Sequence, residues 1–380
     1  MHSPNNMTSD SQTSQVTKPT PRTAVLIVNL GTPASAAPKD VGIYLREFLM
    51  DRYVIDLPFP LRWLLVNCII VPIRARSSAH KYAQIWTSLG SPLLSNTRDF
   101  TAALRKELGV GETNQRAPGV VEELSMAMRY GKPDLESSLA SLHSSGIKKL
   151  IVFPLYPQYA LSVIETVHAR VKDILKERGF QFDLKWIEPF YDKVSFIEPS
   201  AQLLRQQLTR YEPATSHVLF SFHGLPESHI ENFDKTMNKD QAKCLCDPSC
   251  CQDLGKENRQ CYRAQCYFTA REVVRAMKDL GLSLEKDNWS VAFQSRLGKS
   301  KWIQPYTFEK IKNLALSGTK TLYVVTPSFV SDCLESLEEI AIQMKTVFLE
   351  NGGTDFRPLP CLNSDPRWVS GAAQIIKENL

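Results

Sequence analysis

The sequence predicts an α/β protein with two similar halves, each a mainly parallel sheet flanked by helices. Runs of β-branched and apolar residues recur along the chain, for example TAVLIVNLG at residues 23–31 and HVLFSFHGL at 217–225. Each run ends in a polar or proline-containing loop, and most are followed by a stretch with helical periodicity. This repeated β-loop-α unit is typical of Rossmann-like domains, in which ligands bind outside the carboxyl ends of the strands. We therefore expect two such domains with a ligand cleft between them.

The first half of the chain contains three predicted strands. The segment 23–33 is a continuous apolar run that ends in Gly-Thr-Pro, which predicts a buried parallel strand. Further strands are expected at 121–128 and at 148–159, where KKLIVFPLYPQY ends in a proline-rich loop. Helical patterns occupy residues 41–50, 79–89, 96–108, 134–145 and 162–178.

The second half repeats the unit, with strands expected at 217–226, 289–296 and 320–332 and a helix beginning near Phe268. One domain is predicted to comprise residues 23–154 together with 355–380, and the other residues 155–354. The first 22 residues are rich in Ser, Thr, Asn and Pro and lack an apolar core. This composition predicts a disordered tail and no signal peptide.

Composition argues against several classes of function. The 380 residues are 43% hydrophobic and 22% charged, which is ordinary for a globular protein. The net charge of +5 is spread along the chain, so nucleic acid is not an expected partner. Neither GxGxxG nor GxxxxGKS/T occurs, so a nucleotide cofactor is not expected. Without an export signal we expect a cytoplasmic protein, in which clustered cysteines favour metal or redox chemistry over disulfides.

The stretch LPFPLRWLLVNCIIVPIR at residues 57–74 is apolar but is interrupted by Arg62 and Asn67. Its unbroken apolar run is shorter than the roughly 20 residues that a membrane-spanning helix needs. A buried helix is one interpretation. A surface that faces lipid or a ligand is the other, because Trp63 with flanking arginines suits an interface.

Three strand ends carry residues that suit chemistry. His223 follows an apolar strand in SFHGLP, although a loop histidine is more often structural. Glu335 and Glu339 lie four residues apart, so both carboxylates project from one face of the helix after the last predicted strand. An acidic first turn also has an ordinary explanation in the helix dipole. Arg129 and Tyr130 end a strand of the first half and could clamp an anion, whereas a surface arginine is the default interpretation.

Taken together, these segments resemble one family. VNLGTP, FPLYPQY, FSFHGLP, FQSRLGKSKWIQP and TPSFVSDCLESLEEI occur in the order and approximate spacing of the ferrochelatases. The resemblance extends from Ala24 to Leu380 and leaves out the tail and a cysteine-rich insert at about 240–266. It implies a lyase that inserts ferrous iron into protoporphyrin IX to form haem. The alternatives are a ferrochelatase for coproporphyrin III, another tetrapyrrole metal chelatase and, outside enzymes, a porphyrin carrier.

The resemblance also implies roles for single residues. His223 matches the cleft histidine of the family, which would accept a proton or bind iron, and Glu335 matches the glutamate that faces it. Substrate Fe²⁺ would bind at these two side chains, and Glu339 would continue an acidic path for protons or iron. The residues that match the porphyrin pocket are Leu30, Tyr130, Trp302 and Phe329, with Arg129 facing a propionate.

Residues from about 50 to 76 match a lip over the family's pocket that in relatives can touch a membrane. Because of this lip, the protein is expected either free in the cytoplasm or peripheral on the inner membrane. The resemblance also implies a monomer or a homodimer. One position departs from the family pattern, because many relatives have Ser-Asp-His where this chain has Ser-Asp-Cys333. A mechanism that needs a second histidine is therefore in doubt. A thiolate could bind iron there, but a small buried cysteine is the simpler interpretation.

Six of the nine cysteines lie between residues 244 and 266. Their spacing fits the usual zinc patterns poorly. The insert resembles an internal segment that carries a 2Fe–2S cluster in a smaller bacterial group of the family, which implies such a cofactor. Four thiolates suffice for the cluster, so the ligands would be four of Cys244, Cys246, Cys250, Cys251, Cys261 and Cys266, with Cys261 and Cys266 the strongest candidates. Zinc and a loop of free thiols are the alternatives.

Overall fold

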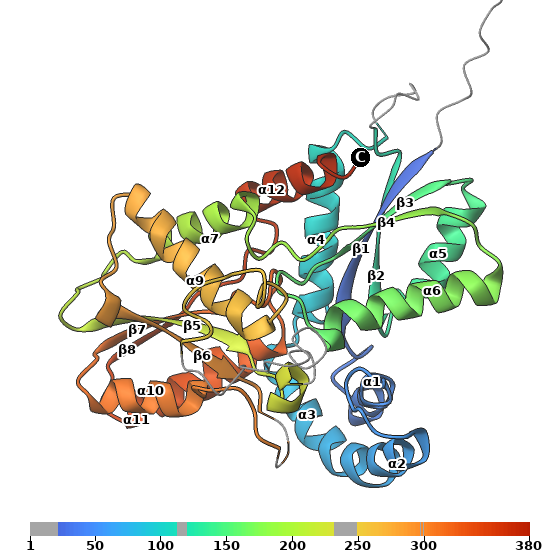
Figure 1. Cartoon of the computed structure of the whole chain (residues 1–380). Coiled ribbons are helices and arrows are strands. Elements are labelled where there is room, and N and C mark those ends of the chain that lie inside the picture. Colours follow the sequence, from blue (N-terminus) through green and yellow to red (C-terminus); the bar gives the residue numbers. More distant parts are fainter. Residues whose placement is uncertain (1–21, 112–119, 232–248, 297, 299) are drawn as a thin grey trace, which may run out of the picture.

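The computed structural model describes residues 22–111, 120–231, 249–296, 298 and 300–380, and it confirms two parallel sheets flanked by helices (Figure 1). The first sheet has the strand order β2-β1-β3-β4 and the second has the order β6-β5-β7-β8, so the two halves share one topology. The strands are β1 (Thr23–Gly31), β2 (Glu123–Tyr130), β3 (Lys149–Pro154), β4 (Asp183–Trp186), β5 (Ser216–His223), β6 (Trp289–Gln294), β7 (Thr321–Val325) and β8 (Asp355–Pro358).

Helices cover both faces of each sheet. The α-helices are α1 (Pro38–Leu49), α2 (Phe59–Leu64), α3 (Val71–Ile85), α4 (Pro92–Glu107), α5 (Leu135–Ser144), α6 (Thr166–Arg178), α7 (Val194–Gln207), α9 (Tyr262–Asp279), α10 (Thr307–Leu316), α11 (Lys345–Glu350) and α12 (Pro366–Lys377). Three π-helical segments are η1 (Leu65–Ile70), η2 (Leu161–Glu165) and η4 (Glu335–Met344), and η3 (Lys286–Asn288) is a short 3₁₀ helix.

The alternation of side chains along β1 explains why this strand is apolar throughout. Ala24, Leu26 and Val28 pack on one face of the sheet, with α5 and α6. Val25 and Ile27 point to the opposite face, where they join a second apolar core. Since both faces are covered, neither set of side chains meets water, and all five residues are buried.

The second core lies between the two sheets and joins them. It takes in the inner faces of both sheets together with α4, α7, α9 and α12. Trp368 of α12 is buried at its centre, with its ring centroid 5.8 Å from that of Phe100, 5.5 Å from Phe190 and 5.9 Å from Phe196. Figure 1 shows α4 and α12 running between the sheets. The two domains therefore share one continuous interior.

The predicted domain boundaries, 23–154 with 355–380 and 155–354, are wrong at two strands. β4 pairs with β3, so the first sheet continues past residue 154. β8 pairs with β7, so residues 355–358 belong to the second sheet. Both strands have only four residues and no continuous apolar run, because each lies at the edge of its sheet. Such short edge strands give too little periodicity to be recognised in the sequence.

The cysteine-rich region differs from prediction in where its helix begins. α9 starts at Tyr262 rather than near Phe268, with Cys261 as its N-cap residue and Cys266 within its first turns. Cys244 and Cys246 lie outside the described residues, as does the predicted tail except for Arg22.

The stretch 57–74 forms α2, η1 and the start of α3, and most of its apolar side chains face outward. Phe59 is 62% exposed, Trp63 49% and Ile73 70%. The interpretation as a buried helix is therefore wrong. None of the helices in the described part of the chain is long and apolar enough to cross a membrane.

A buried histidine gives the fold a dependence on pH. His217 in β5 is 5% exposed, and its Nε2 lies 2.8 Å from the Ser290 hydroxyl oxygen. Burial lowers the pKa of His217 from 6.5 to about 4, because the charged ring loses its hydration, and the positive charge of Lys310 adds to the effect. The unfolded chain therefore takes up a proton at this residue at a higher pH than the folded protein does.

We expect the free energy of unfolding to fall as the pH drops from about 6.5 toward 4, since the unfolded state binds the additional proton in this range. The part due to His217 is at most about 3 kcal/mol. His217→Gln keeps a polar group beside Ser290 and should flatten the fall, as measured by urea unfolding at several pH values. His80→Gln, at an exposed site on α3, is the control. An unchanged pH slope in the His217 variant would contradict this assignment.

Candidate functional site

The topology predicts where a ligand binds. In a sheet of order 2-1-3-4, the strand order reverses between the first and third strands, and a crevice opens at their carboxyl ends. These positions are the ends of β1 and β3 in the first sheet and of β5 and β7 in the second. Both crevices open into one cavity, with a volume of about 220 Å³. Its wall includes residues at or just after the carboxyl end of each of these four strands, namely Asn29–Thr32, Leu155, Tyr156, Gln158, His223, Leu225 and 328–331.

His223 is the last residue of β5, and its side chain is half-buried in this cavity. The Nδ1 atom lies 2.6 Å from the carbonyl oxygen of Gly224. A carbonyl can only accept, so Nδ1 carries the proton, and in the neutral ring Nε2 keeps a free lone pair. The rings of Phe329 and Trp302 lie 6.2 and 6.4 Å from the imidazole, measured between centroids. The second nitrogen of His223 is therefore available as a base or a metal ligand.

Glu335 opens the π-helix η4 and lines the same cavity. Its neighbour Cys333 also lines the cavity, and burial raises the pKa of the Cys333 thiol well above its usual range, with a further contribution from the negative charge of Glu335. Cys333 is therefore a neutral thiol, as the simpler interpretation of the sequence expected. π-helical segments often occur at functional sites, because the wider turn displaces side chains from the usual helical positions.

Glu339 lies one turn further along η4. The backbone N–H of Ser295 donates to its Oε1 at 2.8 Å, and the Ser295 hydroxyl donates to its Oε2 at 2.6 Å. Burial nevertheless raises the pKa of Glu339, and the negative charge of Glu335 adds to this effect while His223 opposes it. The charges of Glu335 and His223 therefore both influence the protonation of Glu339.

The structure brings together five of the residues singled out in the sequence. Leu30, His223, Phe329, Cys333 and Glu335 line the cavity. Trp302 is buried beside His223 without being part of the cavity wall.

Arg129 and Tyr130 point instead toward Asp51. The guanidinium of Arg129 forms an ion pair with Asp51 and donates to the Thr166 hydroxyl at 2.8 Å. The Tyr130 hydroxyl donates to Asp51 at 2.9 Å, and Thr166 donates to the same carboxylate oxygen. The charge of Arg129 is thus already compensated within the protein.

Sequence reasoning missed a set of hydroxyl groups in the cavity wall. Seven hydroxyl-bearing residues of the first half line the cavity, and we call four of them the hydroxyl wall: Thr32, Tyr44, Tyr82 and Ser91. Thr32 donates to Ser91 at 2.8 Å. Burial raises the pKa of Tyr82, and the charge of Glu335 raises it further, so this phenol stays protonated and can donate. No motif marks these residues, because they come from the loop after β1, from α1 and α3, and from the N-cap of α4.

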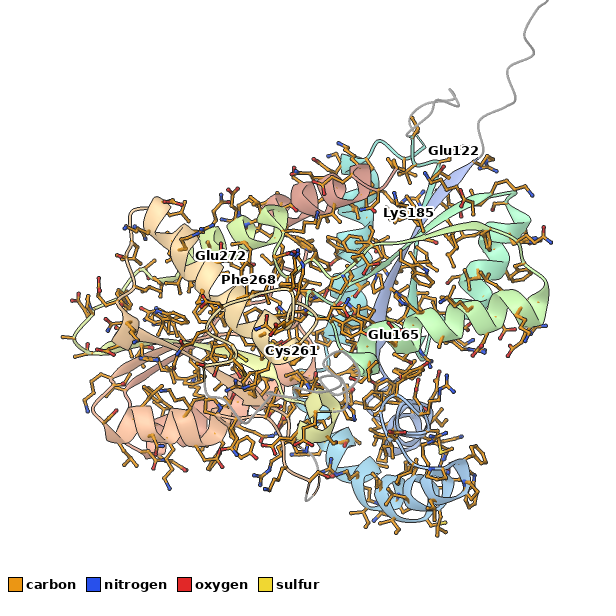
Figure 2. The ribbon with its side chains drawn as sticks, in the orientation of Figure 1. Glu122, Glu165, Lys185, Cys261, Phe268 and Glu272 are labelled. Carbon is orange, nitrogen blue, oxygen red and sulfur yellow. The ribbon has the colours of Figure 1, made fainter. Side chains whose placement is uncertain are left out.

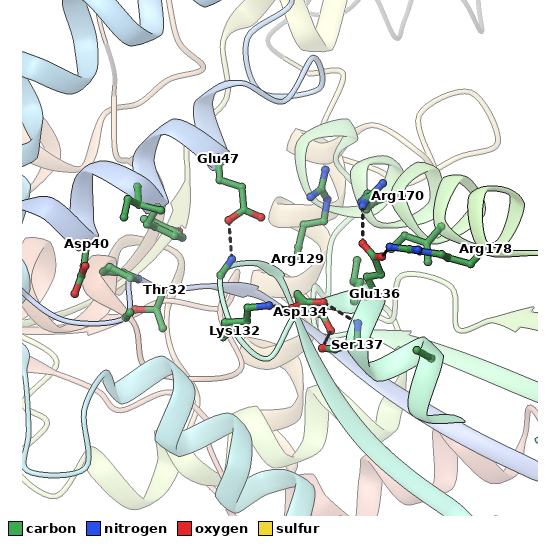
Figure 3. Close-up of a pocket in the computed structure, with 18 of the residues that line it drawn as sticks. Thr32, Asp40, Glu47, Arg129, Lys132, Asp134, Glu136, Ser137, Arg170 and Arg178 are labelled. Atoms are coloured by element: carbon green, nitrogen blue, oxygen red, sulfur yellow. Dashed lines mark hydrogen bonds and ion pairs between the residues drawn. The ribbon is translucent and has the colours of Figure 1, made fainter. Parts of the chain in front are cut away.

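A second cavity, of about 860 Å³, is lined by residues of the first half, as Figure 3 shows, and shares Thr32 and Tyr44 with the smaller cavity. It is larger, but its charged side chains mostly compensate one another. Arg170 and Arg178 both pair with Glu136, and Lys132 pairs with Asp134. The histidine and the cysteine of the smaller cavity have no counterpart in its wall. We therefore assign the smaller cavity as the candidate active site.

Four described cysteines gather around the start of α9: Cys250, Cys251, Cys261 and Cys266. We call them the four thiols. The sulfurs of Cys250 and Cys251 lie 3.6 Å apart, and Arg263 donates to the Cys251 sulfur at 3.1 Å. Burial raises the pKa of Cys251 to about 12 and that of Cys266 well above its usual range. The nearby thiol of Cys261 raises both pKa values further. Cys261 lies near the middle of the molecule (Figure 2). Within the described residues, no three His, Cys, Asp or Glu side chains are placed to hold a single metal ion.

The fold places a histidine and a carboxylate, two side chains that can bind a metal ion or transfer a proton, in one cavity between two α/β domains. The ferrochelatase family model matches residues 22–380. The ferrochelatase of Pseudomonas fluorescens strain SBW25 is 42% identical over 347 residues, which cover 91% of this chain and 95% of that protein. The ferrochelatase of Stutzerimonas stutzeri strain A1501 is 41% identical over 353 residues, which cover 93% and 96%. The chain belongs to the ferrochelatase family.

The chain is accordingly an enzyme that inserts ferrous iron into a porphyrin in haem synthesis. Among solved structures, SirB from Bacillus subtilis with Fe³⁺ aligns with a TM-score of 0.49 and 8% identity, covering 94% of this chain and 95% of that one. This likeness is too weak to add to the family assignment.

Proposed function

We propose that this enzyme inserts Fe²⁺ into protoporphyrin IX and that His223 and Glu335 are its catalytic pair. The observation that carries the proposal is their placement at the switch points of the second sheet, where both line one cavity with Leu30 and Phe329. Apolar side chains suit the face of a porphyrin ring. The family match does not favour another tetrapyrrole as the substrate.

Metal insertion requires a bound Fe²⁺ and the loss of two pyrrole protons, and it transfers no electrons. His223, whose Nδ1–H is held by Gly224, would accept a proton at Nε2. A carboxylate oxygen of Glu335 would bind the incoming iron. Glu339 follows Glu335 by four residues on η4 and has a raised pKa, so it would carry protons away from the cavity.

The hydroxyl wall would contact the substrate. A porphyrin carboxylate accepts hydrogen bonds, and Tyr82 and Ser91 are donors that line the cavity. Arg129 and Tyr130, which the family pattern assigns to the porphyrin, would then act indirectly by holding Asp51. Trp302 would support the ring of His223 from behind.

The wild-type enzyme should metallate protoporphyrin IX with Fe²⁺ under anaerobic, reducing conditions, and coproporphyrin III more slowly. His223→Ala and Glu335→Gln should each lower kcat by at least about 100-fold, since a general base or a metal ligand contributes at that level. Porphyrin binding, followed by the Soret band, should survive in both variants. Near-normal turnover in either one would contradict the catalytic assignment, and a preference for coproporphyrin would contradict the substrate.

The four thiols support a 2Fe–2S cluster as the resident cofactor. Two sulfurs on one tetrahedral metal lie about 3.8 Å apart when the metal–sulfur bonds are about 2.3 Å, and the Cys250 and Cys251 sulfurs are 3.6 Å apart. Cys261 and Cys266 are held by the rigid start of α9. Burial disfavours uncompensated thiolates here, so bound iron would supply the missing positive charge. When bound, such a cluster can exchange one electron, which metal insertion does not require, so its role here would be structural or regulatory.

Protein purified anaerobically should show thiolate-to-iron absorption in the visible and contain about two irons and two sulfides per chain. Cys261→Ser or Cys266→Ser should remove this absorption and lower the melting temperature. Cys68→Ser is the matched control, because Cys68 is an exposed cysteine remote in sequence from the four thiols. A colourless wild-type protein that contains zinc or no metal would contradict the proposal.

The lip, residues 50–76, supports peripheral contact with a membrane. It presents Phe59, Trp63, Leu64 and Ile73 to solvent, each at least 49% exposed. Arg74 and Arg76 are exposed next to them. An apolar surface edged by arginines suits a bilayer that contains anionic lipids.

Replacing both Trp63 and Leu64 with Ser should weaken binding to vesicles of phosphatidylglycerol and phosphatidylethanolamine by at least tenfold, since two large apolar side chains would leave the lipid. Unfolding should remain cooperative, because neither residue is buried. Phe308→Ser, on α10 and 48% exposed, is the control. If wild type and variant bind equally, or if neither binds, the lip does not contact lipid.

A further inference from the structure

Tyr262 joins the four thiols to the candidate catalytic histidine. It is the first residue of α9, directly after Cys261, and it also lines the active-site cavity. Its hydroxyl donates to the backbone carbonyl of His223 at 2.7 Å. The same oxygen lies 3.2 Å from the Ser328 hydroxyl, which in turn accepts the backbone N–H of His223 at 3.0 Å. Tyr262 and Ser328 thus hold both backbone groups of His223.

This arrangement fixes the imidazole through the main chain. The Nδ1–H of His223 binds the carbonyl of Gly224, the next residue. The peptide that links the two residues carries the carbonyl that Tyr262 holds. Rotation of this peptide would move the imidazole of His223 together with the Gly224 carbonyl that accepts its Nδ1–H. The bond from Tyr262 opposes this rotation and so restricts the direction in which Nε2 points.

Tyr262 lies between two of the four thiols at the start of α9. Cys261 directly precedes it as the N-cap residue, and Cys266 follows four residues later, about one helical turn along the same side of the helix. Tyr262 is buried, and burial raises its pKa well above the usual range, so the phenol remains a hydrogen-bond donor. A change at Cys266 that moves the start of α9 therefore acts directly on the bond to His223.

The start of α9 is also tied to the first domain. Gln265 accepts the backbone N–H of Tyr159 at 2.7 Å, and its amide donates to the carbonyl of Arg259 at 2.7 Å. Both contacts involve the turn of helix that carries Tyr262 and Cys266. The first turn of α9 is therefore bonded to segments on both sides of it. A displacement of this turn would be transmitted to the bond between Tyr262 and His223.

We propose that Tyr262 is a positioning residue for metal insertion and that it couples the state of the four thiols to the orientation of His223. This inference rests on the proposed role of His223 as proton acceptor. The proposed coupling does not depend on which group the four thiols bind. It requires only that binding or release of that group changes the position of the thiols at the start of α9. The thiols would then regulate turnover without taking part in the chemistry.

Tyr262→Phe removes the hydroxyl and keeps the ring. We expect kcat for Fe²⁺ insertion to fall about tenfold, the effect of one lost buried hydrogen bond on a reacting group, while the KM for porphyrin changes less than twofold. Tyr191→Phe is a matched control, since the Tyr191 hydroxyl donates to a backbone carbonyl, that of Arg259 at 3.2 Å, close to the start of the same helix. Its kcat should stay within twofold of wild type.

The coupling has a readout apart from turnover. In ¹H–¹⁵N spectra of the imidazole nitrogens, the His223 signals should shift or broaden in Tyr262→Phe and in Cys266→Ser, but not in Tyr191→Phe. In a double-mutant cycle, Cys266→Ser should lower kcat in the wild-type background and have little further effect in Tyr262→Phe. If Tyr262→Phe does not fold, Ser328→Ala interrupts the same contact and should give the same shift.

Three outcomes overturn the inference. Unchanged kcat and unchanged His223 signals in Tyr262→Phe would remove the positioning role. Fully additive effects of Cys266→Ser and Tyr262→Phe would remove the coupling. Near-normal turnover by His223→Ala would overturn the proposed function itself. This outcome is distinguishable from failure of the Tyr262 inference alone, because Tyr262→Phe would then alter the His223 signals without a loss of kcat.

Discussion

The apolar core between the two sheets is the constraint on which the cleft depends. The inner faces of both sheets and the helices α4, α7, α9 and α12 share this core, with Trp368 packed against three phenylalanines. Protein interiors are close-packed, so sliding one sheet against the other would open voids and is strongly disfavoured. The carboxyl edges of the two sheets are therefore held in one relative position. A cavity built from both edges can be precise only because this core is continuous.

The two halves share one topology but supply different chemistry. A π-helical segment follows the third strand of each sheet, η2 after β3 and η4 after β7. The first half contributes apolar side chains and the hydroxyl wall, whereas the second contributes His223, Glu335 and the four thiols. The hydroxyl wall and the proposed catalytic pair therefore come from different halves of the chain. The ion pair between Lys81 of α3 and Glu338 of η4, at 3.2 Å, joins the two sides.

Interactions with neighbouring groups distinguish supporting residues from reactive ones. Asp51 is held by Arg129, Tyr130 and Thr166, and Glu339 by two bonds from Ser295. The buried charge of Asp51 is compensated by Arg129, whereas the bonds from Ser295 fix the orientation of Glu339 without removing the cost of its burial. His223 is held through its backbone and Nδ1. These contacts fix the direction of Nε2, the nitrogen to which we assign the proposed proton transfer.

The sequence by itself determined the strand-helix units, the two sheets, the family and the residues that follow conspicuous strands, His223 and Glu335 among them. These features are local, because hydrophobic periodicity and strand-end motifs are written in consecutive residues. Only the tertiary structure decided that β4 and β8 extend the sheets, that Arg129 turns to Asp51, and that Tyr262 meets His223. These are contacts between segments far apart in the chain. Their partners are selected by packing, and one sequence gives no periodic signal of where two distant side chains will meet.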